Sequence, residues 1–309
     1  MKVFVAGGSG AVGRVLVPRL VAAGHEVAAT TRSADRVALL ESLGAKPVVV
    51  DALDAEALAA AVRGFKPDAL MNQLTSLPQR YNPRGIKPWY EATSRLRVEA
   101  TRTLLRAVAE VGATRFIYQS IAFMYALAGP RVLDEAAPLA LEAAEPFGSS
   151  VRATAEGERL AMSAEGVVGV VLRYGQLYGP GTYFALDGDF AIQARRRMLP
   201  VIGDGGGLFS FLHMDDAATS ALAALERGAG VYNITDDDPA PAREWIPAFC
   251  KEVGAPTPWR VPAWVARLAA GEFAVSQLTE GRGASNAKAK RELAWTPSRP
   301  TWRYSGLTR

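Results

Sequence analysis

Short apolar runs alternate with stretches of helical spacing from the start of the chain to about residue 174, and this pattern predicts the fold. Each run ends in glycine or polar residues, and apolar residues three or four positions apart follow most of them. Strands that alternate with helices in this way form a doubly wound parallel sheet of the α/β class, with a ligand crevice along the carboxyl ends of the strands. The predicted strands are residues 3–6, 27–31, 46–50, 68–71, 115–119 and 167–173, and the clearest later helices are residues 90–111 and 149–165.

Four glycines follow the first predicted strand within a few residues. Their spacing satisfies both G-x-G-x-x-G and G-x-x-G-x-x-G. Glycine suits such a turn because its backbone reaches angles closed to other residues and can approach a pyrophosphate closely. The next helix then points its free N–H groups at the phosphates. The pattern predicts a Rossmann-type dinucleotide site, with phosphate-loop contacts from Gly7, Ser9, Gly10, Ala11, Val12 and Gly13.

The end of the second predicted strand indicates which dinucleotide to expect. An acidic residue there bonds the ribose 2′-hydroxyl of NAD, whereas a cation accommodates the 2′-phosphate of NADP. The chain has no carboxylate at this position but has Arg32 and, one turn further on, Arg36, so we expect NADP (NADPH), with NAD less favoured. The alternative is that both arginines are only solvated residues at a helix start.

Other predicted cofactor contacts follow the later strands at the same edge of the sheet. Asp51 is placed to accept a hydrogen bond from the adenine amino group. The remaining contacts expected there are Ala52, Gln73, Leu74, Thr75, Tyr174 and Leu177.

Beyond residue 174 the alternation loosens, and proline and glycine become frequent. We therefore predict a dinucleotide-binding domain over residues 1–174, with residues 208–235 returning to it, and a smaller, mainly substrate-binding part over residues 175–309. The proline-rich stretch 76–89 is too long for a plain connector and predicts a loop over the active site. Tyr81 in that loop, Gln176 and Arg195 are candidate substrate contacts.

Motifs spread over nearly the whole chain resemble the extended short-chain dehydrogenase/reductase family, the group of nucleotide-sugar epimerases and dehydratases. They include the glycine loop, the stretch 172–181 (Leu-Arg-Tyr-Gly-Gln-Leu-Tyr-Gly-Pro-Gly), the stretch 211–217 and the ending 285–295. The resemblance implies a nicotinamide cofactor and a tyrosine–lysine pair on the helix after the fifth strand. Lysine lowers the pKa of the tyrosine so that the phenol can exchange a proton.

The chain departs from that family at the tyrosine and the lysine. In the matching context, 146–151, Phe147 replaces the tyrosine and Val151 replaces the lysine. Neither side chain carries a proton, so Phe147 is expected to contact substrate instead. Arg152 beside the lost lysine could supply a cation. Hydroxyls near the ends of the fifth and sixth strands are the candidate catalytic groups: Ser120, Tyr125, Tyr174 and Tyr178. Core packing is the alternative for each tyrosine.

The resemblance also implies a homodimer in which residues 90–111 and 149–165 form a four-helix interface. A monomer that buries the same apolar stripes against its own sheet would have the same pattern.

Composition narrows the class of protein. The 309 residues carry a net charge of +4, with basic residues scattered among acidic ones, so nucleic-acid binding is not indicated. One cysteine excludes internal disulfides and fits a reducing compartment. His25 and His213 are too few and too separated to suggest a metal site. The apolar runs are too short to span a membrane and no signal peptide is apparent, so we expect a cytoplasmic protein.

The function expected from the sequence is that of an NADP-binding oxidoreductase of atypical extended type, acting on a small polar or biosynthetic intermediate. Loss of the tyrosine and lysine leaves two alternatives open. One is a cofactor-binding sensor or scaffold that catalyses nothing, and the other is non-redox chemistry of epimerase, dehydratase or cyclase type in the same crevice.

Overall fold

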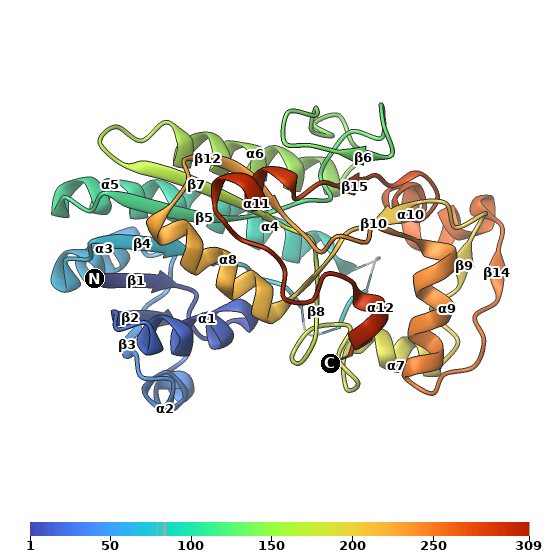
Figure 1. Ribbon diagram of the computed structural model, residues 1–309, viewed down its shortest axis with the longest axis horizontal. Helices are drawn as coiled ribbons and strands as arrows, with labels where there is room; N and C mark the ends of the chain where they lie inside the picture. Colours follow the sequence, from blue (N-terminus) through green and yellow to red (C-terminus); the bar gives the residue numbers. More distant parts are fainter. Residues whose placement is uncertain (79, 83–84, 309) are drawn as a thin grey trace.

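The computed structural model describes residues 1–78, 80–82 and 85–308 and is built on a seven-stranded parallel sheet (Figure 1). The strand order is β12-β7-β5-β4-β1-β2-β3, with every neighbouring pair parallel. The strands are β1 (Lys2–Ala6), β2 (Glu26–Thr31), β3 (Lys46–Val49), β4 (Ala69–Asn72), β5 (Arg115–Ile121), β7 (Val168–Tyr174) and β12 (Gly230–Ile234). This confirms the predicted α/β, Rossmann-type fold. The order reverses between β1 and β4, where such sheets bind their ligands.

Alternate residues of β1 lie in two separate cores, as the two-residue period of a strand requires. Val3 and Val5 pack in the core that contains α1 (Ala11–Ala22), part of α2 (Val37–Ser42) and α8 (Met214–Glu226). Phe4 and Ala6 pack in the core that contains α3 (Ala55–Phe65) and α5 (Thr101–Val111). Both faces of the sheet are therefore covered by helices, which explains why its strands read as continuous apolar runs.

Helix boundaries differ from the predicted ones by a few residues. The predicted helix 90–111 is α4 (Lys87–Arg95), a π-helical turn (Leu96–Ala100) and α5 in succession. The predicted helix 149–165 is α6 (Phe147–Met162). Helix α7 (Asp189–Arg195) ends at Arg195, and Arg197 has a positive φ of 60°. Residues 79, 83 and 84 of the predicted 76–89 loop lie outside the described residues.

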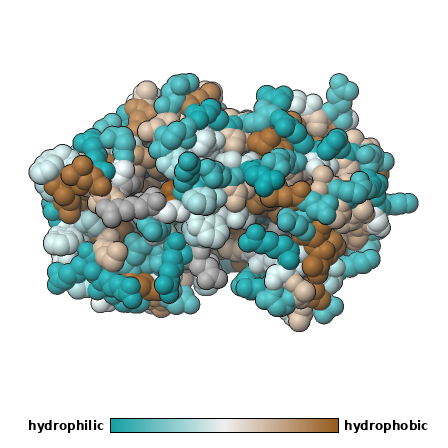
Figure 2. All heavy atoms as spheres, turned by 180° about the vertical axis from the view of Figure 1, so that it is seen from behind, coloured by the Kyte–Doolittle hydropathy of each residue, from teal (hydrophilic) through white to brown (hydrophobic). Residues whose placement is uncertain are grey.

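A second group of elements forms the half of the molecule at the right of Figure 1. Its core is aromatic and includes Phe184, Phe211, Trp245 and Phe249. The elements of this half and its connections are β8 (Gln176–Tyr178), β9 (Val201–Ile202), β10 (Leu208–Phe209), β11 (Phe211–His213), β13 (Ala240–Pro241), α9 (Ala242–Glu252), β14 (Arg260–Val261), α10 (Ala263–Glu280) and α12 (Trp302–Ser305). Figure 2 shows hydrophobic side chains at the surface of this end, on the left in that view. The exposed apolar residues there include Trp259, Trp264 and Leu268.

The chain crosses between the two halves several times. Strand β12 pairs with β7, and α8 packs on α1. Helix α11 (Ala287–Glu292) also packs on β12, and β15 (Gly283–Ala284) pairs with β6 (Val132–Leu133). The sequence reasoning did not place these last two elements against the first domain. In the described part of the chain, no helix is long and apolar enough to cross a membrane.

A buried ion pair joins β7 to α6. Arg173 Nη2 and Nε donate to the two carboxylate oxygens of Glu158 at 2.7 and 2.8 Å, and the two side chains are only 5% and 7% exposed. Two planar hydrogen bonds give this pair a fixed geometry. It therefore fixes α6 on the sheet.

We expect Arg173→Met to lower the free energy of unfolding by about 3–5 kcal/mol, because it leaves the Glu158 carboxylate buried without its cation. Urea unfolding followed by circular dichroism measures this loss. The matched control is Arg63→Met, since the Arg63–Glu56 pair at 2.7 Å is far more exposed and its loss costs at most about 1 kcal/mol. Equal losses in the two variants would contradict the assigned role of the buried pair.

The C-terminal segment is held by a buried carboxylate, Asp236. Its oxygens accept hydrogen bonds from the backbone N–H groups of Asp238 at 3.2 Å and Trp302 at 3.3 Å. Burial raises the pKa of Asp236 to about 8, the backbone hydrogen bonds oppose this rise, and the neighbouring Asp238 and Asp237 carboxylates add to it. The folded protein thus retains a proton on Asp236 at pH values at which the unfolded chain has lost it.

Because the folded pKa lies above the unfolded one, the contribution of Asp236 to stability is complete below pH 4 and falls as the pH rises to about 8. The slope from this one group is about 1.4 kcal/mol per pH unit. Urea unfolding at pH 5, 6.5 and 8 should show Asp236→Asn gaining stability relative to the parent protein as the pH rises. Parallel pH profiles would show that Asp236 does not titrate in this range.

Candidate active site

The turn between β1 and α1 is shaped by positions that have no room for a side chain. Gly7 has a φ of +90°, and a Cβ on it would lie 2.8 Å from the carbonyl oxygen of Gln73. A Cβ on Gly8 would lie 2.5 Å from the Cβ of Ala29, and one on Gly13 would lie 2.4 Å from the carbonyl oxygen of Gly8. These three glycines let the loop fit between β2, β4 and the first turn of α1.

Gly10 differs from these three, because a Cβ there would meet only the Gly7 carbonyl, at 3.2 Å. It precedes the first residue of α1, Ala11, and the first turn of that helix has no acidic residue. The bare backbone at Gly10 thus leaves the helix N-terminus open to an anion. The residues present fit a dinucleotide pyrophosphate. The side-chain hydroxyl of the loop, Ser9 Oγ, donates to Thr31 Oγ1 at 3.1 Å.

Arg14 lies beside this loop in the first turn of α1, and Arg32 and Arg36 follow the end of β2. Arg14 Nε donates to the Ser9 carbonyl at 3.0 Å, and burial together with the charge of Arg36 lowers the pKa of Arg14. Arg32 follows β2 and is exposed. The sequence reasoning named Arg32 and Arg36 but missed Arg14, whose signal was its place in the first turn of the helix after the glycine loop.

The next strand ends also lie along this edge. Asp51 is exposed, accepts from the Leu53 N–H at 3.0 Å, and precedes the buried Ala52. Gln73 is 4% exposed and lies under Gly7, and Leu74 and Thr75 follow it. Figure 1 shows β1 to β4 and the start of α1 in the same half of the molecule.

Ser120 and Tyr125, two of the candidate catalytic groups, are bonded to the buried ion pair. Ser120 Oγ donates to Glu158 Oε1 at 2.6 Å. The Tyr125 hydroxyl accepts from Arg173 Nη1 at 2.9 Å and donates to Asn233 Oδ1 at 2.6 Å. Both residues are at most 2% exposed. Through these hydrogen bonds, the two hydroxyls help to hold β5, β7, α6 and β12 together.

Tyr174 and Tyr178, the other two candidates, are also buried. The Tyr174 hydroxyl donates to the Ala217 carbonyl at 3.3 Å, and burial raises its pKa. The ring of Tyr178 packs edge-on against Phe211 and His213. Leu177, which directly precedes Tyr178 in the sequence, is half-buried and packs against the core that contains α1 and α8.

Phe147 and Val151 lie in an apolar cluster with Met124 at the start of α6. The Phe147 ring is 2% exposed and stacks on Phe273 with 3.4 Å between ring centroids. The neighbouring Arg152 is held by the carbonyl of Leu141 and the carboxylate of Glu145.

The buried cation of this region is Arg97, in the π-helical turn. It is 6% exposed and donates to Thr154, which lies one turn after Val151 on α6. Burial lowers the pKa of Arg97. The sequence signal for it was the arginine in a segment, 97–101, where the resembling family has asparagine.

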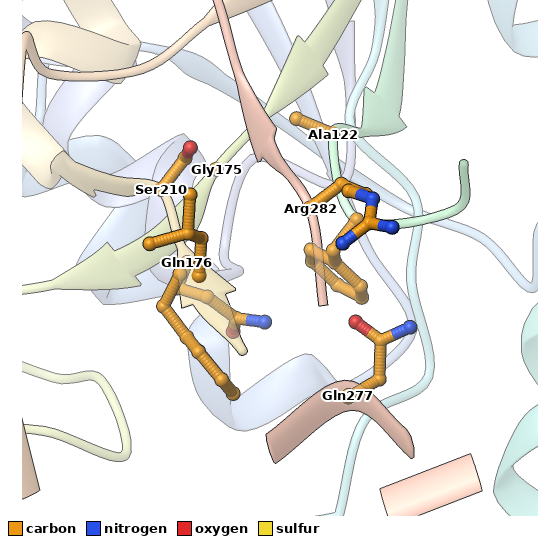
Figure 3. A pocket seen from close by; sticks show the side chains of 9 residues that line it. Ala122, Gly175, Gln176, Ser210, Gln277 and Arg282 are labelled. Carbon is orange, nitrogen blue, oxygen red and sulfur yellow. The ribbon is translucent and has the colours of Figure 1, made fainter. Parts of the chain in front are cut away.

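Gln176, a predicted substrate contact, lines a small pocket beyond the ends of β5 and β7. The pocket is also lined by Ala122, Ser210, Gln277 and Arg282 (Figure 3). In Figure 3 the side chains of Gln176 and Gln277 approach this space from opposite sides. Gln277 and Arg282 come from the end of α10 and the segment after it, which carry no local motif, and the sequence reasoning missed both.

The last two predicted substrate residues have different surroundings. Tyr81 donates its backbone N–H to Asp189 at 2.8 Å, and its ring packs edge-on against Phe190. Tyr81 also lines a cavity of about 290 Å³ that Phe147 and Phe273 help to form. Arg195 donates to the carbonyls of Val253 and Leu186, both at 3.0 Å, and so fixes α7 to its neighbours. The structure does not place Arg195 among the pocket-lining residues given above.

Comparison with known proteins agrees with this geometry. Residues 3–235 match the model of the NAD dependent epimerase/dehydratase family. A 3-diazoavenalumate denitrifying reductase from a Streptomyces species is 45% identical over the full length of both chains. A 2-alkyl-3-oxoalkanoate reductase from Stenotrophomonas maltophilia is 29% identical, over 83% of this chain and 77% of the relative.

Solved structures share the fold. A UDP-glucose 4-epimerase from Thermus thermophilus in complex with NAD has a TM-score of 0.75 at 23% identity, covering 100% of this chain and 97% of that one. A human epimerase family protein with NADPH has a TM-score of 0.73 at 21% identity, covering 97% and 96%. The predicted resemblance is confirmed, as is the expectation of an enzyme that uses a nicotinamide cofactor. The chain belongs to the NAD-dependent epimerase/dehydratase family and is an enzyme of its reductase and epimerase type.

Proposed function

We propose that the protein is an NADPH-dependent reductase that removes a diazo group from its substrate as N₂. The observation that carries this proposal is the apolar cluster of Phe147, Val151 and Met124 at the positions where the resembling family has its tyrosine and lysine. The 45% identity with a denitrifying reductase of a diazo compound supports it.

Among the described residues, the hydroxyl groups near this cluster are held in other hydrogen bonds. Ser120 and Tyr125 are bonded to the ion pair of Glu158 and Arg173. The phenol beside the cluster, Tyr90, is bonded to Tyr81, and burial raises its pKa above the ordinary value. Reduction of a carbonyl requires protonation of the resulting oxyanion, so this arrangement favours a substrate whose reduction needs no such proton.

A diazonium group meets that requirement. When bound, the reduced nicotinamide supplies a hydride. The C–N bond of R–N₂⁺ breaks with its electron pair leaving in N₂, and the carbon takes the hydride with both of its electrons, so that R–N₂⁺ and H⁻ become R–H and N₂. Charges balance without a proton. The chain's own residues then have to position the substrate and exclude water, which an apolar cluster does.

The arginine cluster supports NADP over NAD. Arg14, Arg32 and Arg36 would hold the 2′-phosphate, because guanidinium groups bind phosphate by short charge-assisted hydrogen bonds. The glycine loop with Ser9, Ala11 and Val12 would hold the pyrophosphate. Asp51 and Ala52 would lie by the adenine, and Gln73, Leu74 and Thr75 by the ribose and nicotinamide side of the crevice.

We also propose that the protein is a homodimer whose interface is formed by α4, α5 and α6. The exposed faces of these helices carry the ion pairs Arg95–Glu99 and Arg102–Glu156, which a second copy would have to cover. Size-exclusion chromatography with light scattering distinguishes the dimer from a monomer.

Replacing Arg32 and Arg36 together by alanine should weaken NADPH binding by about ten-fold or more and change NADH binding by less than about two-fold. Only NADPH carries the phosphate that these cations would bind. Fluorescence titration measures both affinities. Arg63→Ala is the control, because Arg63 lies on α3 and is paired with Glu56 and Glu110. Equal weakening of NADPH and NADH would count against a 2′-phosphate site.

With 4-diazoniobenzoate as the probe, NADPH and the protein should release N₂ and form benzoate faster than NADPH alone. NADPH deuterated at the transferred C4 position should place one deuterium on the ring carbon that loses nitrogen. The catalytic rate should change little between pH 6 and 8, because no acid titrates in the step. A steep fall with rising pH would reveal a protein acid, and tight NADPH binding without any N₂ release would favour a sensor or scaffold.

A further inference from the structure

A cavity beside the proposed reaction site has four aromatic residues among its lining residues. Its volume is about 290 Å³, and it lies between the segment before α4, the start of α6 and the middle of α10. The residues that carry the argument are Tyr81, Tyr90, Phe147 and Phe273, with Arg267 and Glu272 among the remaining lining residues.

One wall of the cavity is a pair of stacked rings. Phe147 and Phe273 are stacked with 3.4 Å between ring centroids and an interplanar angle of 21°, so each ring covers one face of the other. Phe147 is 2% exposed and Phe273 is half-buried, so Phe273 is the ring of this pair with surface left for a ligand. The ring of Tyr90 lies 6.3 Å from that of Phe147 at 59°, within the centroid distances of about 4.5–7 Å at which aromatic rings make tilted contacts. Burial raises the pKa values of Tyr81 and Tyr90, so both phenols remain neutral. An aromatic ring that enters this cavity therefore meets neutral phenols on the side formed by Tyr81 and Tyr90.

The size of the cavity limits what it can hold. An apolar protein cavity of about 150 Å³ is enough for benzene, so about 290 Å³ suits one ring with a short chain. A nucleoside diphosphate is larger and needs cations. In the described residues that line the cavity, the cation is Arg267, and its Nε is paired with Glu272 Oε2 at 2.8 Å. The acid Glu145 is bonded to Arg152 and to Ser149.

The cavity is continuous with the cluster that occupies the proposed reaction site. Phe147 lines the cavity and also packs with Val151, Met124 and the half-buried Ile121, which ends β5 at the carboxyl edge of the sheet. Helix α10, which forms one wall of the cavity, bends at Gly271. The φ of +82° and ψ of 165° at this residue form a backbone conformation that is essentially restricted to glycine. A Cβ there would meet no atom within 4 Å, so backbone shape rather than packing requires this glycine.

We propose that this cavity binds an aromatic ring of the substrate, which makes the substrate of the proposed reductase an aryl compound. The inference rests on the proposed function for the reaction but on the cavity itself for the ring. Phe273 is the residue that sets specificity, because it is the half-buried ring of the stacked pair and comes from a helix that bends beside it.

The test uses binding and does not depend on turnover. With NADP⁺ present, calorimetry should show trans-cinnamate binding about five-fold or more tighter than 3-cyclohexylpropanoate, a saturated acid of similar length. Phe273→Leu keeps the wall apolar but removes the ring, and it should reduce that preference to about two-fold or less while leaving NADP⁺ affinity unchanged. The control is Trp264→Leu on the same helix, because the ring of Trp264 is 68% exposed.

Equal affinity for the two acids, or an unchanged preference in Phe273→Leu, would overturn the aromatic site. These outcomes are separate from those of the diazo assay. Selective cinnamate binding without N₂ release would leave the cavity assignment in place and remove the proposed reaction. N₂ release without ring selectivity would do the reverse.

Discussion

The close contact between the β1–α1 turn and the strands on either side is the constraint on which the cofactor site depends. The turn lies against the backbone of Gln73, the residue that follows β4, and against Ala29 in β2. It fits there because Gly7 and Gly8 have no side chain. This contact fixes the direction of α1, whose N-terminus then points along the carboxyl edge of the sheet. The positive end of the helix and the arginines after β2 define where a dinucleotide would lie.

A second constraint, on the other side of the crevice, is the buried ion pair of Glu158 and Arg173. The hydroxyls that looked catalytic in the sequence, those of Ser120 and Tyr125, complete the hydrogen bonds of the Glu158–Arg173 pair. A buried ion pair is costly unless its remaining donors and acceptors are satisfied, so these partners have a structural reason to be present. The arrangement leaves the apolar start of α6, with Phe147 and Val151, facing the region where a substrate would react.

Much of the fold could be predicted because its signals are local. Strand β1, the glycine loop and α1 follow from periodicity and glycine spacing, and the Asp54 side chain caps α3 by accepting from Ala57 N–H at 3.0 Å. The arginines after β2 could be read in the same way. The cavity walls could not, because Tyr81, Phe147 and Phe273 are far apart in the sequence. Likewise, the sequence does not distinguish a buried tyrosine such as Tyr174 from a surface tyrosine, because tertiary packing decides which of them is buried.

The aromatic residues of the cavity and the hydrogen bonds that already hold the nearby hydroxyls are consistent with one chemical requirement. An aryl diazonium that loses N₂ reacts with whatever nucleophile is nearest, and water would convert it to a phenol instead of the reduced product. In the proposed reaction, a wall of Phe147, Phe273 and Met124 would keep water from the reacting carbon while it held the ring. A tyrosine and a lysine at 147 and 151 would bring polar groups, and water with them, into this space. Phenylalanine and valine at these positions would therefore suit a reaction in which excluding water matters more than donating a proton.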